Sequence, residues 1–478
     1  MEHWNRTYLG LPGHDTFQKI HFIGVGGVGM SGIAEILLNE GFAISGSDLD
    51  ASPATERLQE RGGIIYTQHQ ANNVHYADLV VISSAIQESN VELQEARRLR
   101  LPVIRRATML AELMRFRYGV AVSGTHGKTT TTCLVANVLA GGGLDPTYVI
   151  GGQVSSLKSS NARLGNSPYL VAEADESDGS FLDLLPAIAV VTNIDQDHLQ
   201  AYEGDMHYLR EAFIQFLHKL PFYGHAFVCI DDANVQKILP WVERPCVTYG
   251  FGEQADLQAL DYQQHGLLSS FTVKDKIRDQ SYEIEINLPG HHNVLNCLAA
   301  IGVGLELGMK AKSIQQTLAE FPGVKKRFQS LGYIQPLSHQ ASVEVTLDYA
   351  HHPSELEAII KTARMCWPDK RLVFVFQPHR YSRTRELLDD FAVVLERVDV
   401  LLMLDVYSAG EPSLPDANTK ALCRSIRSRK QLEPIYVGNN DNLAATLLRL
   451  IQPDDKVIMS GAGDISRLAQ QVVAEYGV

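Results

Sequence analysis

The sequence is short of cysteine, of net positive charge and of long apolar runs. Its six cysteines are scattered, mostly among valine, leucine and alanine, and form no C-x-x-C pair. They therefore indicate small buried residues rather than disulfides, metal ligands or nucleophiles. A formal charge of −13 argues against a general nucleic-acid-binding protein, because contacts to a phosphate backbone need a basic face.

No apolar run approaches the roughly 18 residues that would span a bilayer, and residues 1–6 lack the apolar core of a signal peptide. We therefore expect a cytoplasmic protein that does not insert into membranes. The apolar fraction of 45% and the charged fraction of 20% are those of a soluble globular protein. At about 150 residues per domain, the 478 residues predict about three domains.

A glycine-rich turn, Ser123-Gly124-Thr125-His126-Gly127-Lys128-Thr129-Thr130, lies between a predicted strand at 118–122 and the body of a predicted helix at 133–140. The backbone N–H groups of such a turn converge on an anion, and the helix N-terminus adds partial positive charge. Lys128 would reach the outer phosphates of a nucleotide and Thr129 would bind Mg²⁺. The pattern predicts a site for ATP or GTP.

This loop is a variant of the common G-x-x-x-x-G-K-[ST] pattern, because Val122 stands where that pattern has its first glycine. The alternative is a Gly-Lys-Thr helix start with a capping threonine and no ligand. Four consecutive threonines are poor helix formers, so propensity alone would not place a helix here. Phosphate binding explains the helix start better.

A second glycine-rich turn, Gly24-Val25-Gly26-Gly27-Val28-Gly29, fits G-x-G-x-x-G, and Asp48 lies where a dinucleotide fold binds ribose. Predicted strands and a helix surround the turn as a βαβ series with a parallel sheet, at 19–23, 30–39, 43–48 and 77–83. Taken alone, this motif favours a nicotinamide-dependent dehydrogenase. A hydride-transfer enzyme does not need a second loop for a γ-phosphate. We therefore assign the first loop to the diphosphate of a nucleotide-linked substrate and the second to ATP.

Further apolar runs predict two more α/β sheets. The central strands are expected at 169–173, 188–193 and 225–230, and the C-terminal strands at 371–376, 398–404 and 456–460. An amphipathic helix at 106–114 would carry the chain from the first sheet to the second.

Polar clusters follow two of the central strands, at 173–178 (EADESD) and 193–198 (NIDQDH). Ligands of open parallel sheets bind beyond the carboxyl ends of the strands, so both clusters can reach the phosphate loop. Carboxylate oxygens with one imidazole suit Mg²⁺ or Mn²⁺, whereas zinc would call for more histidine or cysteine. The sequence thus predicts Glu173 and His198 as metal ligands. The alternative is a solvated acidic loop with a surface histidine.

Two further polar clusters, at 346–355 and 376–385, follow C-terminal strands. Arg380 and Arg383 could grip a carboxylate, because a guanidinium makes two parallel hydrogen bonds, and Asp348 could accept hydrogen bonds from ribose. A solvated arginine-rich loop is the alternative. The position of both clusters at strand ends favours binding.

Taken together, these motifs resemble those of the Mur ligases, the ATP-dependent amide ligases of peptidoglycan synthesis. Six motifs occur in the family's order over nearly the whole chain, at 24–32, 123–130, 173–178, 193–198, 291–296 and 348–353. Within the family, the likeness is to the branch that joins L-alanine to UDP-N-acetylmuramate.

The resemblance implies an α/β fold of three domains. Residues 1–116 would form a Rossmann-like domain that binds the UDP-sugar. Residues 117–324 would form a central P-loop ATPase domain with a parallel sheet, and residues 325–478 a Rossmann-like domain that binds the amino acid and closes over ATP.

The resemblance also implies roles for single residues. Those expected to serve catalysis are Lys128, Glu173 and His198, and those expected to hold Mg²⁺, or Mn²⁺ in its place, are Thr129, Glu173 and His198. The residues expected at ATP are Gly124, Thr125, His126, Gly127, Lys128, Thr129, Thr130, Asn293, Asn296, Arg327 and Asp348. Those expected at UDP-N-acetylmuramate and L-alanine are Gly24, Gly26, Gly27, Gly29, Ser84, His351, Arg380 and Arg383. Several family members carry a carbamylated lysine after the metal histidine, but residues 199–218 contain no lysine.

The implied reaction starts when the muramyl carboxylate attacks the γ-phosphorus to give an acyl phosphate. The alanine amine then attacks the carbonyl, and the tetrahedral intermediate collapses to amide, ADP and phosphate. Positioning and charge neutralisation dominate such transfers, so no side-chain nucleophile is expected. Three alternatives stay open: a recycling ligase that adds a free tripeptide, a dehydrogenase, and a nucleotide-dependent switch without chemistry. A homodimer is one assembly that the sequence leaves open.

Overall fold

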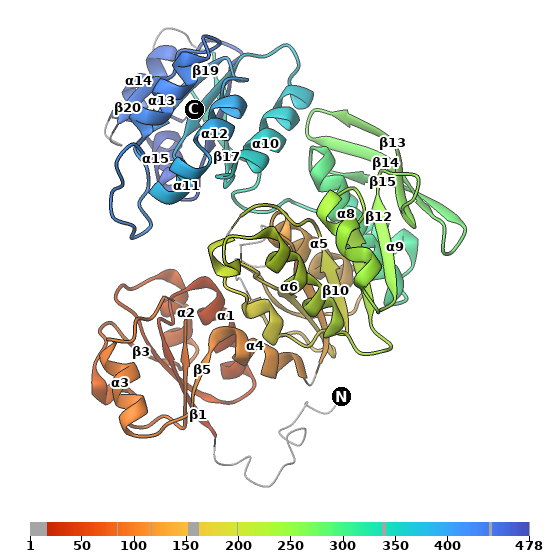
Figure 1. The fold of residues 1–478 in the computed structure, drawn as a ribbon, viewed down its shortest axis with the longest axis vertical. Coiled ribbons are helices and arrows are strands. Elements are labelled where there is room, and N and C mark those ends of the chain that lie inside the picture. The colour runs from red at the N-terminus through yellow and green to blue at the C-terminus, as the bar shows by residue number, and fades with distance from the viewer. Residues whose placement is uncertain are drawn as a thin grey trace. The chain divides into compact units, whose positions relative to one another are not determined.

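The computed structural model describes residues 17–83, 85–115, 117–151, 162–197, 199–336, 341–438 and 442–477 (Figure 1). The described residues form three β-sheets, with helices connecting many of their strands. They divide into two compact units. The first unit comprises the described residues up to Tyr262 with 271–285 and 294–321, and the second comprises 263–270, 286–293 and those from Pro322 onward.

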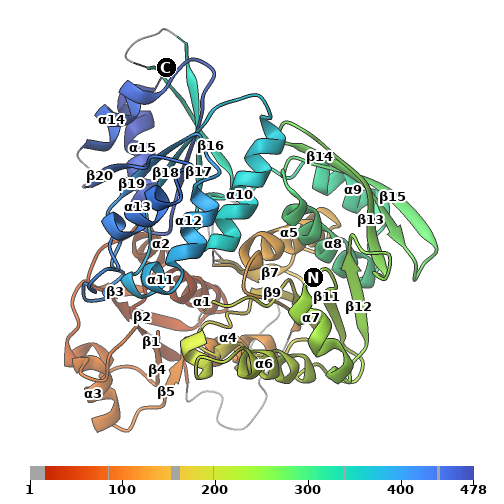
Figure 2. The ribbon, with the colours of Figure 1, turned by 45° about the horizontal axis from the view of Figure 1, so that its top comes forward.

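The N-terminal sheet has the strand order β3-β2-β1-β4-β5, and its strands run parallel (Figure 2). Its elements are β1 (Lys19–Ile23), α1 (Val28–Asn39), β2 (Ala43–Ser47), α2 (Pro53–Glu60), β3 (Ile64–Tyr66), β4 (Leu79–Ile82), α3 (Val91–Arg98), β5 (Val103–Arg105) and α4 (Arg106–Arg115). Ile20 of β1 pairs with Ile44 of β2 on one side and with Leu79 of β4 on the other. The predicted βαβ series is confirmed.

The central sheet has the order β15-β14-β13-β12-β11-β10-β6-β9-β7-β8. Its first elements are β6 (Tyr118–Ser123), α5 (Lys128–Gly141), β7 (Thr147–Val149), β8 (Ala162–Arg163), β9 (Tyr169–Glu173), β10 (Ile188–Val191) and α6 (Met206–His218). They are followed by β11 (His225–Cys229), α7 (Ala233–Ile238), β12 (Cys246–Gly250), β13 (Leu257–His265), β14 (Leu268–Asp275), β15 (Gln280–Ile286), α8 (His291–Glu306) and α9 (Ala311–Ala319). The run β12-β11-β10-β6-β9-β7 is parallel, as predicted.

The C-terminal sheet has the order β16-β17-β21-β18-β19-β20. Its first elements are β16 (Gln329–Ile334), β17 (Val343–Asp348), α10 (Pro353–Cys366), β18 (Leu372–Phe376), α11 (Tyr381–Glu386), α12 (Leu388–Leu395) and β19 (Val400–Leu404). They are followed by α13 (Thr419–Ser428), β20 (Ile435–Gly438), α14 (Leu443–Leu450), β21 (Lys456–Ser460) and α15 (Ile465–Tyr476). All neighbours in this sheet are parallel except β16, which runs antiparallel to β17.

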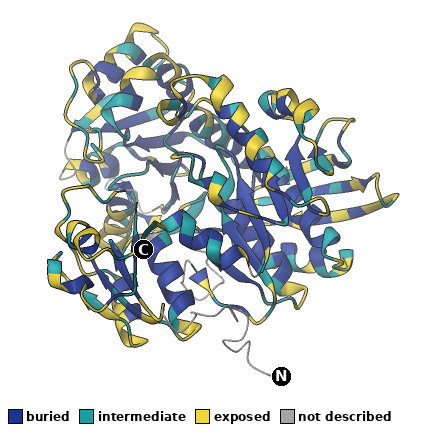
Figure 3. Cartoon of the chain, turned by 60° about the horizontal axis from the view of Figure 1, so that its bottom comes forward, coloured by how far each residue is buried: buried dark blue, intermediate teal, exposed yellow. Residues whose placement is uncertain are grey.

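The strands β18 and β19 of the C-terminal sheet are apolar throughout because both faces of the sheet are covered. On β18, Leu372, Phe374 and Phe376 belong to one core, while Val373 and Val375 belong to the core on the opposite face. Figure 3 shows the strands as largely buried and the exposed residues as gathered on loops and on the outer sides of helices. The continuous apolar runs of the sequence therefore mark doubly covered strands.

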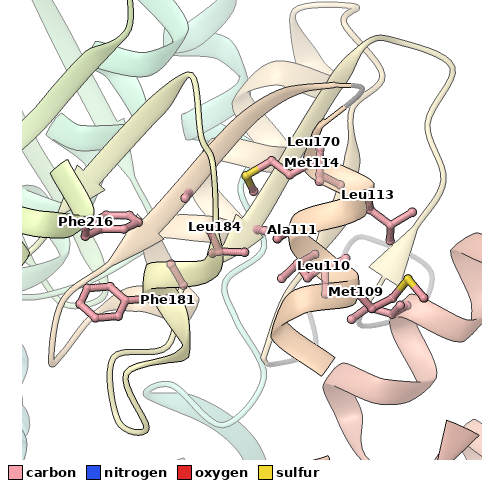
Figure 4. Close-up of a cluster of buried hydrophobic side chains, with 14 of the residues drawn as sticks. Met109, Leu110, Ala111, Leu113, Met114, Leu170, Phe181, Leu184 and Phe216 are labelled. Carbon is pink, nitrogen blue, oxygen red and sulfur yellow. The ribbon is translucent and has the colours of Figure 1, made fainter. Parts of the chain in front are cut away.

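Helix α4 links the N-terminal sheet to β6 through a shared core (Figure 4). The ring centroid of Phe181 lies 5.0 Å from that of Phe216 in a stacked arrangement. The buried side chains labelled in this core are Met109, Leu110, Ala111, Leu113, Met114, Leu170, Phe181, Leu184 and Phe216. The predicted amphipathic connection at 106–114 is confirmed.

The cysteines and helices agree with the expectations from composition. All six cysteines carry free thiols, and five of them are buried. Within the described ranges, no helix combines the length and the apolar character needed to cross a membrane.

Candidate active site

The predicted phosphate loop connects the buried end of β6 to the N-terminus of α5. Gly127 is the residue before the first helical turn and has φ +82° and ψ −6°, a left-handed conformation that favours glycine. A Cβ at this position would lie 2.7 Å from Oδ1 of Asn296, so a side chain would also clash. No side chain caps this helix start at Gly127. The first-turn amides are therefore oriented as an anion site requires.

Lys128 is held inside this loop. Its Nζ donates hydrogen bonds to the carbonyl oxygens of Gly124 (2.8 Å) and Thr125 (3.2 Å) and to Oε2 of Glu176 (2.7 Å). Burial lowers the pKa of Lys128, but the negative charges of Glu176, Asp175 and Glu173 outweigh burial and raise this pKa above its ordinary value. Lys128 is therefore a permanent cation at the position where a nucleotide's outer phosphates would lie.

The threonines that follow are helical because most of their hydroxyl groups have partners. Thr131 Oγ1 donates to Asn296 Oδ1 (3.0 Å), and Thr132 Oγ1 donates to the carbonyl of Lys128 (2.8 Å). Thr129 Oγ1 lies 3.2 and 3.1 Å from the two carboxylate oxygens of Glu173. The tertiary contacts of Thr129 and Thr131 thus offset the low helix propensity of this run.

The donor set at this point fits a hard divalent cation. A threonine hydroxyl and a carboxylate lie together beside the phosphate loop, and oxygen ligands of this kind suit Mg²⁺ shared with phosphates. Glu173 also accepts a hydrogen bond from the backbone N–H of Gly151 (2.9 Å). His198 lies outside the described residues, so its role as a metal ligand stays a prediction.

The second polar cluster also reaches the loop, as predicted. Oδ1 of Asn193 accepts a hydrogen bond from the N–H of His126 (2.8 Å), and the amide of Asn193 donates to the carbonyl of His126 (3.0 Å). Nε2 of His126 lies 3.0 Å from Oδ2 of Asp195, and the N–H of Asp195 donates to Oγ1 of Thr125 (2.8 Å). This network fixes the loop's conformation from one side.

The N-terminal glycine turn is tied to the end of β2. Gly24 has φ +81°, and the N–H groups of Gly24 and Val25 donate to the carbonyl of Ser47 at 2.9 and 3.0 Å. Oδ2 of Asp48 accepts a hydrogen bond from the N–H of Gly26 (2.7 Å). The sequence pattern assigns Asp48 to ribose. In the structure, its carboxylate stabilises the glycine turn through the hydrogen bond from Gly26.

Two other members of the predicted UDP-sugar set differ in their surroundings. Gly27 is exposed at the start of α1, whereas a Cβ on Gly29 would lie 3.1 Å from the Arg106 side chain. Ser84 lies outside the described residues.

In the C-terminal domain, Asp348 ends β17 and is 2% exposed. Its two carboxylate oxygens accept hydrogen bonds from the N–H groups of Phe328 and Ala350, each at 2.7 Å. Burial raises the pKa of Asp348 to about 6, and these hydrogen bonds and the charge of Arg327 only partly offset the effect of burial. The Arg327 guanidinium lies 5.4 Å from the ring centroid of Tyr349 and 3.9 Å from Glu355.

This pKa predicts how Asp348 contributes to the pH dependence of the C-terminal domain's stability. The folded chain binds a proton on Asp348 between about pH 4 and 6 that the unfolded chain has already lost, so the contribution of Asp348 to the free energy of unfolding falls as pH rises through this window. Two pKa units correspond to about 3 kcal/mol. Asp348→Asn removes this contribution and keeps those of the other titrating groups. Hydrogen exchange of peptides from β17 and β21 in the full chain, corrected for intrinsic rates, should therefore show that the protection of the unmodified chain relative to Asp348→Asn falls between about pH 4 and 6. A difference between the two proteins that does not change with pH would contradict the assignment.

Arg380 has an unusual backbone at the start of α11, with φ +69° and ψ 137°. For a residue other than glycine such a conformation costs on the order of 1–3 kcal/mol, and strain of this kind gathers at functional sites. The N–H of Arg380 donates to the carbonyl of Tyr407 (2.8 Å), and its carbonyl accepts a hydrogen bond from Oγ1 of Thr384 (2.7 Å). Its Nε is buried and has no hydrogen-bond partner among the described residues.

Arg383, His351 and His379 lie beside this turn. NH1 of Arg383 is 3.3 Å from Nδ1 of His379, whose ring stacks on Tyr407 (5.6 Å, 12°) and meets His351 edge-on (5.5 Å). Burial, reinforced by the charges of His351 and Arg383, lowers the pKa of His379 to about 4. His379 is therefore neutral at pH 7, as an acceptor for the arginine must be. Arg383 and His351 thus both contact His379, which lies next to Arg380 in the chain.

Sequence reasoning did not identify His379 or Tyr407. Both directly follow apolar strands, β18 and β19, which is the same signal that marks Arg380. It also did not identify Glu176 as the partner of Lys128, although Glu176 lies in the acidic run. Of the predicted adenine-side residues, Asn293 donates to the carbonyl of Pro289 (2.8 Å), and Asn296 contacts Thr131.

Three family models match the chain in succession. They are the Mur ligase family catalytic domain over residues 19–118, the Mur ligase middle domain over 122–304, and the Mur ligase glutamate ligase domain over 327–463. The chain is a Mur ligase. It is thus an ATP-dependent enzyme that forms amide bonds, and its three-domain α/β fold is the one that the motifs predict.

Solved structures of other Mur ligases are similar over most of the chain. The UDP-N-acetylmuramate-alanine ligase of Thermotoga maritima is 28% identical, covers 96% of this chain and 98% of its own, and has a TM-score of 0.80. The UDP-N-acetylmuramate:L-alanyl-gamma-D-glutamyl-meso-diaminopimelate ligase of Neisseria meningitides is 28% identical, covers 65% of this chain and 99% of its own, and has a TM-score of 0.59. A murein peptide ligase from Psychrobacter arcticus, 22% identical over 96% and 98% of the two chains, has a TM-score of 0.69 and shows the shared fold.

Proposed function

We propose that this Mur ligase uses ATP and Mg²⁺ to join L-alanine to the carboxylate of UDP-N-acetylmuramate. The observation that carries the proposal is the hydrogen-bonded group of Lys128, Thr129, Glu173 and Glu176 at an uncapped helix N-terminus. The match to an alanine-adding ligase over 96% of the chain supports the choice of substrates.

In this proposal, the central domain (residues 117–324) binds the phosphates of ATP. Lys128 lies against the outer phosphates, and Thr129, Glu173 and His198 hold Mg²⁺, which supplies neutralisation of the phosphate charge when bound. Gly124, Thr125, His126, Gly127 and Thr130 complete the phosphate loop. The remainder of the nucleotide is bound by Asn293, Asn296, Arg327 and Asp348.

The N-terminal domain (residues 1–116) binds the UDP-sugar, with the diphosphate at the glycine turn, and the contact of Ser84 with this substrate stays a prediction. The C-terminal domain (residues 325–478) binds the amino acid. Arg380 and Arg383 pair with its carboxylate, because a guanidinium matches a carboxylate with two hydrogen bonds, and His351 lies beside them. A cytoplasmic location and a homodimer remain predictions.

The chain's residues assist the reaction by position and charge. The muramyl carboxylate attacks the γ-phosphorus while Lys128 neutralises the developing charge, and ADP leaves. The alanine amine then attacks the acyl phosphate, and phosphate leaves with one former carboxylate oxygen. No side chain forms a covalent bond in this scheme.

A second candidate substrate is a free tripeptide in place of alanine. It is favoured by the match to the Neisseria ligase, which is also 28% identical, although that match covers 65% of this chain. Both reactions need the same phosphate loop, so the amino substrate separates them.

The test is ATP-dependent phosphate release with UDP-N-acetylmuramate and either L-alanine or the tripeptide L-alanyl-γ-D-glutamyl-meso-diaminopimelate. We expect release with L-alanine and little with the tripeptide. Release with the tripeptide alone would assign the chain to recycling.

Gly27→Ala tests the glycine turn. Gly27 has φ −60° and ψ 141°, which alanine adopts readily, and a Cβ there would meet the Gly24 carbonyl at an ordinary 3.5 Å. The methyl group should therefore leave the fold intact but exclude the diphosphate. Calorimetry should show a Kd for UDP-N-acetylmuramate raised by about tenfold, the loss of roughly 1.4 kcal/mol. The Kd for ADP and the Tm should stay unchanged.

Gly26→Ala is the contrasting variant, because its Cβ would lie 2.8 Å from Oδ2 of Asp48. It should lower the Tm as well as the affinity. Unaltered UDP-sugar binding by Gly27→Ala would place the diphosphate elsewhere.

A further inference from the structure

Every N–H donor of the Lys128 side chain has a protein acceptor. An ammonium group carries three donors, and Nζ of Lys128 makes three hydrogen bonds, to Gly124 O, Thr125 O and Glu176 Oε2. A phosphate oxygen that is to bind Lys128 must therefore displace one of these acceptors. The shortest of the three contacts, at 2.7 Å, is the ion pair with Glu176.

Glu176 is built rigidly into this position. Its side chain is 1% exposed, and its backbone carbonyl accepts hydrogen bonds from the hydroxyl of Tyr202 and from the N–H of Gly179 (3.0 Å). Its second carboxylate oxygen, Oε1, is buried without a hydrogen-bond partner among the described residues. The carboxylate is thus desolvated and depends on Lys128 for its compensation.

The geometry points to Glu176 as an internal counter-ion that competes with the β-phosphate of a nucleotide for Lys128. The two carbonyl acceptors belong to the loop itself and are fixed by its conformation. Glu176 belongs to a separate segment after β9, and its carboxylate offers the same charge and the same type of acceptor as a phosphate oxygen. This inference rests on the proposed nucleotide site and assigns Glu176 a positioning role toward Lys128.

Competition of this kind lowers the affinity for every nucleotide whose phosphate must bind Lys128. ADP carries a β-phosphate and should bind more tightly once Glu176 loses its charge, whereas AMP ends at the α-phosphate and should be unaffected. In the enzyme, Glu176 would favour release of ADP, because its carboxylate takes over the lysine as the product leaves.

The test is calorimetry of ADP and AMP with the full chain in the presence of EDTA. Glu176→Gln should lower the Kd for ADP by about tenfold, since a hydrogen bond to a charged group contributes on that order, and should change the Kd for AMP by less than about twofold. Asp178→Asn is the matched control, because Asp178 is exposed and its Oδ1 accepts a hydrogen bond from the N–H of Ser180 (3.0 Å). This control should bind ADP like the unmodified protein.

Glu176→Asp adds a variant that keeps the charge but withdraws the carboxylate from Lys128 by one methylene group. It should also bind ADP more tightly, which loss of general repulsion would not explain. An ADP affinity that is unchanged or weaker in both Glu176 variants would overturn the inference, as would an equal gain in Asp178→Asn. If Glu176→Gln binds ADP more weakly than the unmodified protein when Mg²⁺ is present, but not in EDTA, Glu176 is a metal ligand. That result would also overturn the inference.

The outcome is independent of the amino substrate. If ADP binds as expected but phosphate release needs neither L-alanine nor UDP-N-acetylmuramate, the proposed function fails and the role of Glu176 stands. If neither the unmodified protein nor Glu176→Gln binds ADP, both fail.

Discussion

Lys128→Ala is expected to lower phosphate release by about a thousandfold or more, the scale on which enzymes lose rate when a cation at a transferring phosphoryl group is removed. Lys128 is a cation at the start of α5 with a side chain that is 14% exposed, and we propose that its charge serves the phosphates rather than the packing of a core. A stopped assay with saturating UDP-N-acetylmuramate and L-alanine measures the loss.

The structure adds a necessary control for this variant. Lys128→Ala leaves the Glu176 carboxylate buried without its partner, which should cost about 3–5 kcal/mol of stability. Lys128→Ala combined with Glu176→Gln removes that uncompensated charge and should recover most of the Tm while turnover stays lost. Phosphate release near the normal rate in either folded variant would refute the role of Lys128.

Arg380→Ala is expected to raise the KM for L-alanine by tenfold or more. The loss of a charged hydrogen bond costs about 1.5–3 kcal/mol, while the KM for ATP should change far less. Arg380 is suited to this role because its strained backbone follows His379, which contacts Arg383, and its buried Nε has no hydrogen-bond partner in the described ranges.

Two variants sharpen this test. Arg380→Lys keeps the charge but not the two parallel hydrogen bonds, so it should recover only part of the alanine affinity. Arg385→Ala removes an exposed arginine from the same helix and should leave the KM for L-alanine unchanged. If Arg380→Ala and Arg383→Ala both keep the normal KM, the amino-acid carboxylate binds elsewhere and the tripeptide reaction gains support.

The sheets could be predicted from the sequence because doubly covered parallel strands are continuous apolar runs. The run at 371–376 is an example, and its strand β18 spans Leu372–Phe376. The antiparallel edge strand β16 was not predicted, since an edge strand with one open side lacks such a run. Strands β13–β15 were also not predicted, although residues 282–286 alternate between buried and exposed positions as a half-covered strand does.

Some residues of the candidate site could likewise be predicted from the sequence, and others could not. Lys128, Thr129 and Glu173 could be predicted because they occur in local motifs at strand ends. Nothing in the acidic run at 173–178 tells which carboxylate faces Lys128, because that depends on how the chain turns after β9. The left-handed backbone of Arg380 was equally hidden, since a positive φ is expected at glycine and not at arginine.

The mechanism is tested most directly by the fate of the carboxylate oxygens of UDP-N-acetylmuramate. The substrate would be labelled with ¹⁸O in that carboxylate and converted with ATP and L-alanine, and the released phosphate would be analysed by mass spectrometry. Activation through an acyl phosphate transfers one labelled oxygen to each phosphate formed. Phosphate without label, at the same yield of amide, would show that the carboxylate never attacks the γ-phosphorus.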